Sequence, residues 1–400
     1  MKYWLLIILC IFINCNQPTK MEIKTENPDK LTNLIESAKS SFAPDKRTAI
    51  FDVAFSHENA TTIITAETNL PQAKDSLLAL ARKIDSIVID SIRVLPDNKI
   101  GDKKYGIINL SVSNLRSEPR HSAELATQAL LGTPVKIFDC DADEVWFRVQ
   151  TADEYIAWVD RGGIIAIDKP MLDSWINATK IIYTKHYGFS YSQPDVTSQT
   201  VSDLVIGDML QLTSADEYFY KVAYPDGRQA YILATDAQRY DEWLALRNPT
   251  AENIISSAKS FMGIPYLWGG TSAKGLDCSG FTKTVFFLNG ILLPRDASQQ
   301  VLTGELVETN DNYAQLQTGD LLFFGRRATD AQKERITHVA IYMGNGQYIH
   351  ASGRITINSF DPKSEIYSEE RMKAFVKAKR ILNSLDKNGI YSLKNIKFDY

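Results

Sequence analysis

Cysteine is scarce in this sequence, with four residues in 400, at positions 10, 15, 140 and 278. Cysteines this few and scattered argue against a disulfide framework and against the repeated Cys-x-x-Cys pairs of structural zinc sites. An excess of one charge is also missing, because 44 basic and 48 acidic side chains are interspersed and give a formal net charge of −4. Since nucleic-acid binding needs a basic surface, we expect no nucleic acid as a partner.

The sequence also lacks an apolar run long enough to cross a bilayer, which takes roughly 20 residues. Its longest run, Tyr3 to Ile13, has eleven residues and follows a lysine, as in an export signal. Cys15 comes directly after this region and before a polar stretch, which resembles a bacterial lipoprotein signal whose cysteine is acylated. An ordinary secretory signal is the alternative, because Asn14 stands where a small residue is usual. We expect a signal peptide over residues 1–15, a tether over 16–27, and export to the cell envelope or periplasm with a lipid anchor at Cys15.

Residues 28–98 alternate between helical and strand periodicity, which predicts a small α+β domain. The predicted elements are a helix over 28–41, strands over 48–55 and 61–68, a helix over 71–84 and a strand over 87–94.

Two following segments, 105–168 and 177–241, are short β-rich runs that resemble each other. Pro119 matches Pro194 and Gly132 matches Gly207, each pair 75 residues apart. This spacing predicts a duplicated β-barrel, although two unrelated β domains could share it. The aromatic strand pairs that follow resemble the bacterial SH3-like domains attached to cell-wall enzymes.

Cys278 opens a predicted helix in the segment 250–382. Phe281, Val285 and Leu288 follow helical spacing, and Gly290 is a stop signal, so the helix should run from about residue 279 to 289. A thiol in the first turn of a helix meets unpaired N–H groups and the positive end of the helix dipole, and we expect both to lower its pKa. A lone cysteine is more often an inert buried thiol, but this position favours a nucleophile.

Two histidines on a predicted hairpin are candidate partners of the thiol, His338 before the turn and His350 after it. A two-residue loop would place them on opposite faces of the sheet. A three-residue loop with Gly346 in the left-handed conformation would set His350 opposite Ala340, on the same face as His338. We predict this second register because cooperation requires it. Zinc binding by the cysteine and both histidines is the alternative.

Four motifs in this segment resemble the NlpC family of cell-wall cysteine peptidases. They are DCSGF at Cys278, GDLLFF at Asp320, HVAIYMGNG at His338 and YIHASG at His350. The resemblance implies a papain-like α+β fold, with Cys278 as nucleophile, His338 as general base and His350 as the group that orients it. It also implies cleavage between γ-linked D-glutamate and a diamino acid in peptidoglycan stem peptides.

The same resemblance implies several substrate-binding residues around the nucleophile. Tyr266 and Trp268 stand where family members line the cleft, and the Tyr266 hydroxyl could serve the oxyanion. Asp277 and Ser279 flank the cysteine. The PRDASQQ segment, residues 294–300, also resembles a cleft-lining segment, without individual roles for its residues.

Close relatives hold the free amine of an N-terminal L-alanine with acidic residues and a tyrosine, part of them from the first SH3-like domain. Matching segments point to Glu124 and Tyr155 for this role, together with Asp277. A carboxylate buried beside Asp277 would be costly without a cation, which makes an ammonium group the natural ligand. A solvated glutamate on a barrel loop is the alternative for Glu124.

Together these observations predict an α+β protein in which a papain-like NlpC cysteine peptidase domain follows two SH3-like β-barrels and a small N-terminal α+β domain, with a tail over 383–400. We expect a monomer without metal or cofactor that cuts small murein peptides with a free L-alanine end. The alternatives are an endopeptidase that remodels intact peptidoglycan and a peptidoglycan-binding lipoprotein without catalysis.

Overall fold

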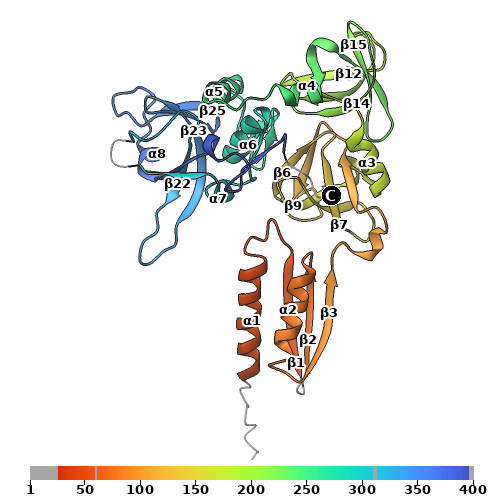
Figure 1. Ribbon diagram of the computed structural model, residues 1–400, viewed down its shortest axis with the longest axis vertical. Helices are drawn as coiled ribbons and strands as arrows, with labels where there is room; N and C mark the ends of the chain where they lie inside the picture. The colour runs from red at the N-terminus through yellow and green to blue at the C-terminus, as the bar shows by residue number, and fades with distance from the viewer. Residues whose placement is uncertain (1–25, 59–60, 310–312, 396–400) are drawn as a thin grey trace, which may run out of the picture.

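The computed structural model describes residues 26–58, 61–309 and 313–395 (Figure 1). The predicted signal peptide and the lipid-anchor residue Cys15 lie outside these residues. None of the helices in the described ranges combines the length and apolar character needed to cross a bilayer.

The N-terminal unit is a three-stranded sheet with two helices packed on one face. Strand order is β1-β2-β3, with β1 antiparallel and β3 parallel to the central β2. Alternate residues of β2 are buried, and Ile64 on that face shares a core with Leu31 and Leu77 of the helices. The elements are α1 (Glu26–Phe42), β1 (Phe51–Glu58), β2 (Thr61–Thr68), α2 (Pro71–Ala81) and β3 (Ile87–Val94), which confirms the order predicted from periodicity.

Two seven-stranded barrels follow, and they share one strand order. The first runs β10-β4-β7-β8-β9-β5-β6, and the second, read from its other edge, runs β17-β11-β14-β15-β16-β12-β13. Each strand of the first barrel therefore has a counterpart in the second. The first comprises β4 (Tyr105–Ile108), β5 (Val112–Arg116), β6 (Leu125–Leu130), β7 (Pro134–Cys140), β8 (Trp146–Gln150), β9 (Ile156–Asp160) and β10 (Ile164–Ile167).

The second barrel lies between two short helices. Its strands are β11 (Lys180–Tyr183), β12 (Tyr187–Tyr191), β13 (Thr200–Val205), β14 (Met209–Ala215), β15 (Phe219–Ala223), β16 (Gln229–Leu233) and β17 (Ala237–Arg239), and its flanking helices are α3 (Lys169–Asn177) and α4 (Tyr240–Ala245).

The matched glycines of the repeats lie at the contact between the barrels. Gly132 and Gly207 have φ of +80° and +97°, which favours glycine. A Cβ on Gly132 would collide with the carbonyl oxygen of Met209, whose N–H donates to the Leu131 carbonyl at 3.0 Å. The repeated glycine therefore serves both the turn and the close approach of the two barrels.

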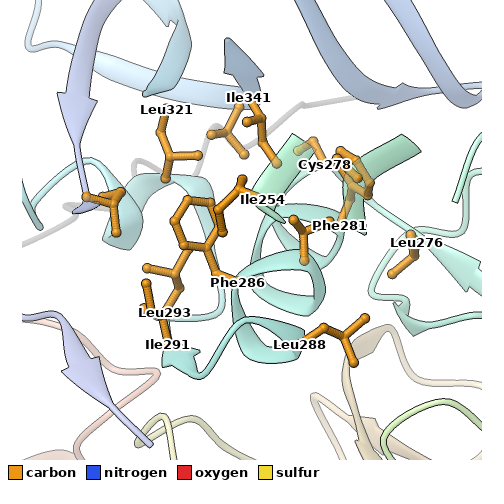
Figure 2. Packing of buried hydrophobic residues seen from close by; sticks show 14 of the residues in the cluster. Ile254, Leu276, Cys278, Phe281, Phe286, Leu288, Ile291, Leu293, Leu321 and Ile341 are labelled. Atoms are coloured by element: carbon orange, nitrogen blue, oxygen red, sulfur yellow. The ribbon is translucent and has the colours of Figure 1, made fainter. Parts of the chain in front are cut away.

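The C-terminal domain is a six-stranded antiparallel sheet in the order β21-β26-β22-β23-β24-β25, with α6 packed on one face. Figure 2 shows Phe281 and Phe286 of this helix close to Leu321 and Ile341 of the sheet. The helices are α5 (Ala251–Ser260), α6 (Cys278–Leu288), α7 (Ala297–Gln300) and α8 (Glu369–Ala374). The strands are β18 (Thr271–Ser272), β19 (Gly275–Leu276), β20 (Ile291–Leu292), β21 (Glu305–Val307), β22 (Leu321–Arg326), β23 (Arg335–Gly344), β24 (Gln347–Ser352), β25 (Arg354–Ser359), β26 (Phe375–Arg380) and β27 (Tyr391–Ser392).

The segment predicted to be a tail belongs to this domain as far as it is described. β27 pairs with β20, and Ile390 is fully buried. Its few apolar residues are too short a pattern to show periodicity, which is why the sequence did not reveal this packing.

The β23–β24 hairpin has the register that the two histidines require. Ile341 pairs with Ile349 and Tyr342 with Tyr348, so His350 falls opposite Ala340. Gly346 is left-handed with φ of +73°. The extra residue that sets this register, however, does not lie in the loop. Gly344 pairs with Gln347, which leaves a two-residue loop, and the register shifts between Tyr342 and Gly344. A β-bulge at Met343 therefore provides the offset that was predicted for the loop.

Candidate active site

Cys278 is the first residue of α6, as the helix signals predict. Asp277 caps the helix by accepting a hydrogen bond from the Gly280 N–H at 2.7 Å. The chain leaves the helix through Gly290, whose φ is +85°. The backbone N–H of Val339, the residue after His338 on β23, donates to the Cys278 sulfur and so places the thiol against this strand.

The predicted lowering of the thiol pKa is wrong. Burial and the neighbouring Asp277 carboxylate raise the pKa of Cys278 to about 11. The helix start and the Val339 N–H favour the thiolate, but the loss of hydration at a cysteine that is only 8% exposed outweighs them. In the absence of substrate, Cys278 is therefore a neutral thiol.

The two histidines form a hydrogen-bonded chain that continues to an asparagine. His338 Nε2 lies 2.7 Å from His350 Nδ1, and His350 Nε2 lies 2.8 Å from Asn358 Oδ1. Asn358 Nδ2 donates to the Ile366 carbonyl at 2.9 Å, which fixes which end of the amide faces the ring.

This chain determines the tautomers of both rings. Because Asn358 presents an oxygen, His350 Nε2 carries a proton and its Nδ1 accepts from His338 Nε2. The remaining lone pair of His338 then lies on Nδ1, which is the form a general base needs. Both ring nitrogens of His350 are engaged, so this residue offers no lone pair for the zinc alternative.

Burial also keeps both rings neutral. It lowers the pKa of His338 well below its usual value, with the positive charge of Arg371 acting in the same direction. Burial lowers the pKa of His350 to about 4, although the hydrogen bond to Asn358 opposes the shift. A neutral imidazole beside a neutral thiol is thus the resting state.

Sequence reasoning did not find Asn358. It lies on β25, where Thr356 pairs with His350, so Asn358 is on the same face two residues further along. An amide in the alternating segment RITINS was the available signal, but it could be recognised only once the strand pairing was known.

A cleft of about 710 Å³ brings the other predicted residues together. It is lined from the C-terminal domain by Tyr266, Trp268, Asp277, Cys278 and Ser279, and from the first barrel by Glu124 and Tyr155. Burial raises the pKa of Tyr266 to about 12, with the Asp277 carboxylate acting in the same direction, so its hydroxyl stays a proton donor. Across the described residues, no three or more His, Cys, Asp or Glu side chains form a group that could hold a metal ion.

Asp277 already has a counter-charge within the protein, so the cost of burying a carboxylate beside it does not by itself require an ammonium ligand. Arg295 contacts both oxygens of Asp277, at 2.5 and 3.1 Å, and is 1% exposed. The same carboxylate accepts from the Gly269 N–H at 3.0 Å, while Ser279 Oγ accepts from Arg295 at 3.0 Å. The ion pair therefore holds the residues on both sides of the nucleophile.

The first barrel supplies the opposite lip of the cleft. Trp268 Nε1 donates to Glu124 Oε1 at 2.7 Å, which joins the barrel to the C-terminal domain. Tyr155 is 8% exposed, and its hydroxyl donates to Asp296 Oδ2 at 3.4 Å. Burial and the Asp296 charge raise the pKa of Tyr155, which keeps its proton. Glu124 is thus exposed but held in place.

A buried thiol, an imidazole chain of fixed tautomer and a cleft shared with an SH3-like barrel define a cysteine peptidase with an accessory domain. Family models agree: the NlpC/P60 family matches residues 263–377 and the bacterial dipeptidyl-peptidase SH3 domain matches residues 115–164. The chain belongs to the NlpC/P60 family of cysteine peptidases.

The chain is similar to relatives of known name. The chain is 33% identical over 236 residues to the "Gamma-D-glutamyl-L-lysine dipeptidyl-peptidase" of Bacillus cereus, and this alignment covers 57% of this chain and 67% of that protein. It is 28% identical over 272 residues to "Dipeptidyl-peptidase 6" of Lysinibacillus sphaericus, covering 66% and 94%. A crystal structure of an NlpC/P60 family protein from Bacillus cereus aligns with a TM-score of 0.58 at 26% identity, covering 69% of this chain and 99% of that one.

Proposed function

We propose that this protein hydrolyses the bond between γ-D-glutamate and the diamino acid in murein stem peptides that carry a free N-terminal L-alanine. The observation that carries the proposal is that Cys278, the predicted nucleophile, and Glu124, the predicted amine ligand, line one cleft although they belong to different domains. The name of the Bacillus cereus relative, a gamma-D-glutamyl-L-lysine dipeptidyl-peptidase, supports the same activity.

In the proposed reaction, His338 Nδ1 takes the thiol proton as the sulfur attacks the γ-glutamyl carbonyl carbon. The carbon–sulfur bond forms, and the carbonyl oxygen becomes an oxyanion that the Tyr266 hydroxyl and the N-terminal turn of α6 stabilise. The imidazolium then gives its proton to the departing diamino-acid nitrogen as the carbon–nitrogen bond breaks. Water, deprotonated by the same imidazole, cleaves the thioester and restores the thiol.

The substrate's amino end is the proposed determinant of specificity. The L-alanine ammonium would lie among the carboxylate of Glu124, the hydroxyl of Tyr155 and the edge of Asp277. An intact glycan-attached stem has an amide at this position, which carries no positive charge and continues into a bulky chain that the barrel would obstruct.

We further propose that the protein acts as a monomer outside the cytoplasm, held at the membrane by an acylated Cys15. Small peptides released from the wall would then reach the cleft by diffusion.

Three substrates test the proposal side by side: L-Ala-γ-D-Glu-diamino-acid tripeptide, its N-acetylated form, and purified sacculi. We expect rapid cleavage of the free tripeptide alone. Faster release from sacculi would favour wall remodelling instead. If Cys278→Ala retained full hydrolysis, the assigned nucleophile would be wrong, and if neither form cleaved any of the three, a binding role would be the better account.

A further inference from the structure

The N-terminal unit reaches the substrate cleft, although it lies outside both matched family ranges. The loop between α1 and β1 provides Lys46, Arg47, Ala49 and Ile50 to the same cleft that contains Cys278. The cleft therefore has a wall that neither the peptidase domain nor the first barrel supplies.

Arg47 and Asp45 of this wall contact the C-terminal domain. Arg47 Nη1 donates to Asp296 Oδ2 at 2.6 Å and to Ser298 Oγ at 2.8 Å. Its Nε and Nη2 contact the two oxygens of Asp45 at 2.8 and 2.7 Å. Asp45 in turn accepts from Gln299 Nε2 at 2.9 Å. Nearly all donors of the Arg47 guanidinium are thus used. Arg47 can therefore hold other residues in place, but it has few donors left for a substrate.

The loop is also fixed from the side of the first barrel. The Ile156 N–H donates to the Arg47 carbonyl at 2.7 Å, and Gln150 Nε2 donates to the Thr48 carbonyl at 3.2 Å. Ile50 packs in an apolar cluster with Leu95 and Phe138. These contacts therefore fix the backbone that carries the Arg47 side chain.

The charge of Asp296 gives this contact a consequence for the substrate. Asp296 keeps 27% of its side chain exposed, and Arg47 is its nearest cation, since Arg295 is 3.7 Å away and already paired with Asp277. A γ-linked D-glutamate retains a free α-carboxylate. Without Arg47, this carboxylate would enter a cleft in which Asp296 has only the more distant Arg295, already paired with Asp277, as a cation, and the two negative charges would repel each other.

We infer that Arg47 is a positioning residue for substrate binding: it neutralises Asp296 and fixes the Asp296–Ser298 segment, and so makes the N-terminal unit part of the site that accepts a γ-glutamyl residue with a free α-carboxylate. The inference rests on the proposed function. It assigns to residues 26–95 a role in specificity in addition to their packing on the barrel.

The test is the kinetics of Arg47→Met in the full chain, with two tripeptides that carry either D-glutamate or its uncharged α-amide, D-isoglutamine. We expect KM for the D-glutamate peptide to rise about tenfold, with kcat changed by less than about threefold, because the chemical groups are untouched. KM for the D-isoglutamine peptide should rise less, so the ratio of the two values should increase. Asp296→Asn in the Arg47→Met background should lower the ratio again.

Arg93→Met is the matched control. Arg93 belongs to the same unit and pairs with Glu67 and Asp97, and with Asp139 of the first barrel at 2.8 Å, but it does not line the cleft. It should leave the KM ratio unchanged. Equal effects of the two variants, or an unchanged ratio in Arg47→Met, would overturn the inference, because Arg47 would then only help the unit to dock.

Activity of the unmodified chain separates the two proposals. If it does not cleave the D-glutamate tripeptide, the proposed function fails. If it cleaves a different murein fragment, the comparison of Arg47→Met with Arg93→Met on charged and amidated forms of that fragment still decides the inference.

Discussion

At the scale of single residues, the reactivity of Cys278 follows from two opposing influences on one sulfur. The helix start favours the thiolate, while burial and Asp277 favour the thiol and prevail. A permanent thiolate–imidazolium pair is therefore not the resting state, and the proton moves to His338 only as the sulfur attacks.

This balance predicts the pH dependence of alkylation. With a pKa raised to about 11, the thiolate fraction is small at neutral pH and grows with each unit of pH. We expect the rate of Cys278 inactivation by iodoacetamide to rise about tenfold per unit between about pH 6 and pH 9. A rate that is already constant below neutral pH would show a preformed thiolate and contradict this account.

Asn358 offers a second test at this scale. Asn358→Leu removes the oxygen that holds the proton on His350 Nε2, so both rings lose their fixed tautomers. We expect kcat to fall at least about tenfold with little change in KM, as for a weakened general base. Asn358→Asp, which keeps an acceptor, should retain most of the activity; equal losses in both variants would refute the tautomer chain.

The sequence predicted functional residues that lie in a recognisable local motif. It did not predict residues whose role depends only on tertiary contacts. Cys278, His338 and His350 stand in recognisable segments. Arg47 meets Asp296 across 249 positions, and no local pattern links a turn in one unit to a helix start in another. The Cys278 pKa was misjudged because the helix start is visible in a sequence, whereas the depth of burial is not.

At the scale of elements, α6 depends on a glycine for its position. A Cβ on Gly280 would collide with the carbonyl oxygen of Gly270, so the first turn could not approach the preceding loop. We expect Gly280→Ala to lower the free energy of unfolding by about 1–3 kcal/mol and to reduce kcat by displacing Cys278.

Thermal unfolding and kcat, measured together, check this prediction. Gly162→Ala is the control, since an added Cβ there would approach only the Asp160 carboxylate, at 3.0 Å. An unchanged melting temperature and unchanged kcat in Gly280→Ala would show that α6 can accommodate a Cβ at this position and would contradict the prediction.

Elements with clear periodicity were predicted well, and elements fixed by distant pairing were not. The helices and strands of residues 28–98 follow from local patterns, whereas the hairpin register was predicted from the requirement that the two histidines share a face. The bulge at Met343 and the pairing of β27 with β20 do not follow from local patterns, because neither leaves a periodic signature.

At the scale of the whole molecule, the proposed site exists only where domains meet. The Trp268–Glu124 hydrogen bond closes the cleft between barrel and peptidase domain. Glu124→Gln keeps an acceptor for Trp268 but removes the charge that the L-alanine ammonium would meet. We expect KM for the free tripeptide to rise about tenfold, and the preference over the N-acetylated peptide to shrink.

Steady-state kinetics on both peptides give the result. Were the preference for a free amine unchanged in Glu124→Gln, the amine would be recognised elsewhere. Such a result would leave the peptidase chemistry intact, because Glu124 is not among the groups proposed to move protons.

The most direct test of the central claim is the identification of products by mass spectrometry after incubation with L-Ala-γ-D-Glu-diamino-acid tripeptide. The account predicts the dipeptide L-Ala-D-Glu and the free diamino acid in equal amounts from the unmodified protein, and intact tripeptide from Cys278→Ala. Cleavage at the L-alanine bond, or the same products from Cys278→Ala, would contradict it.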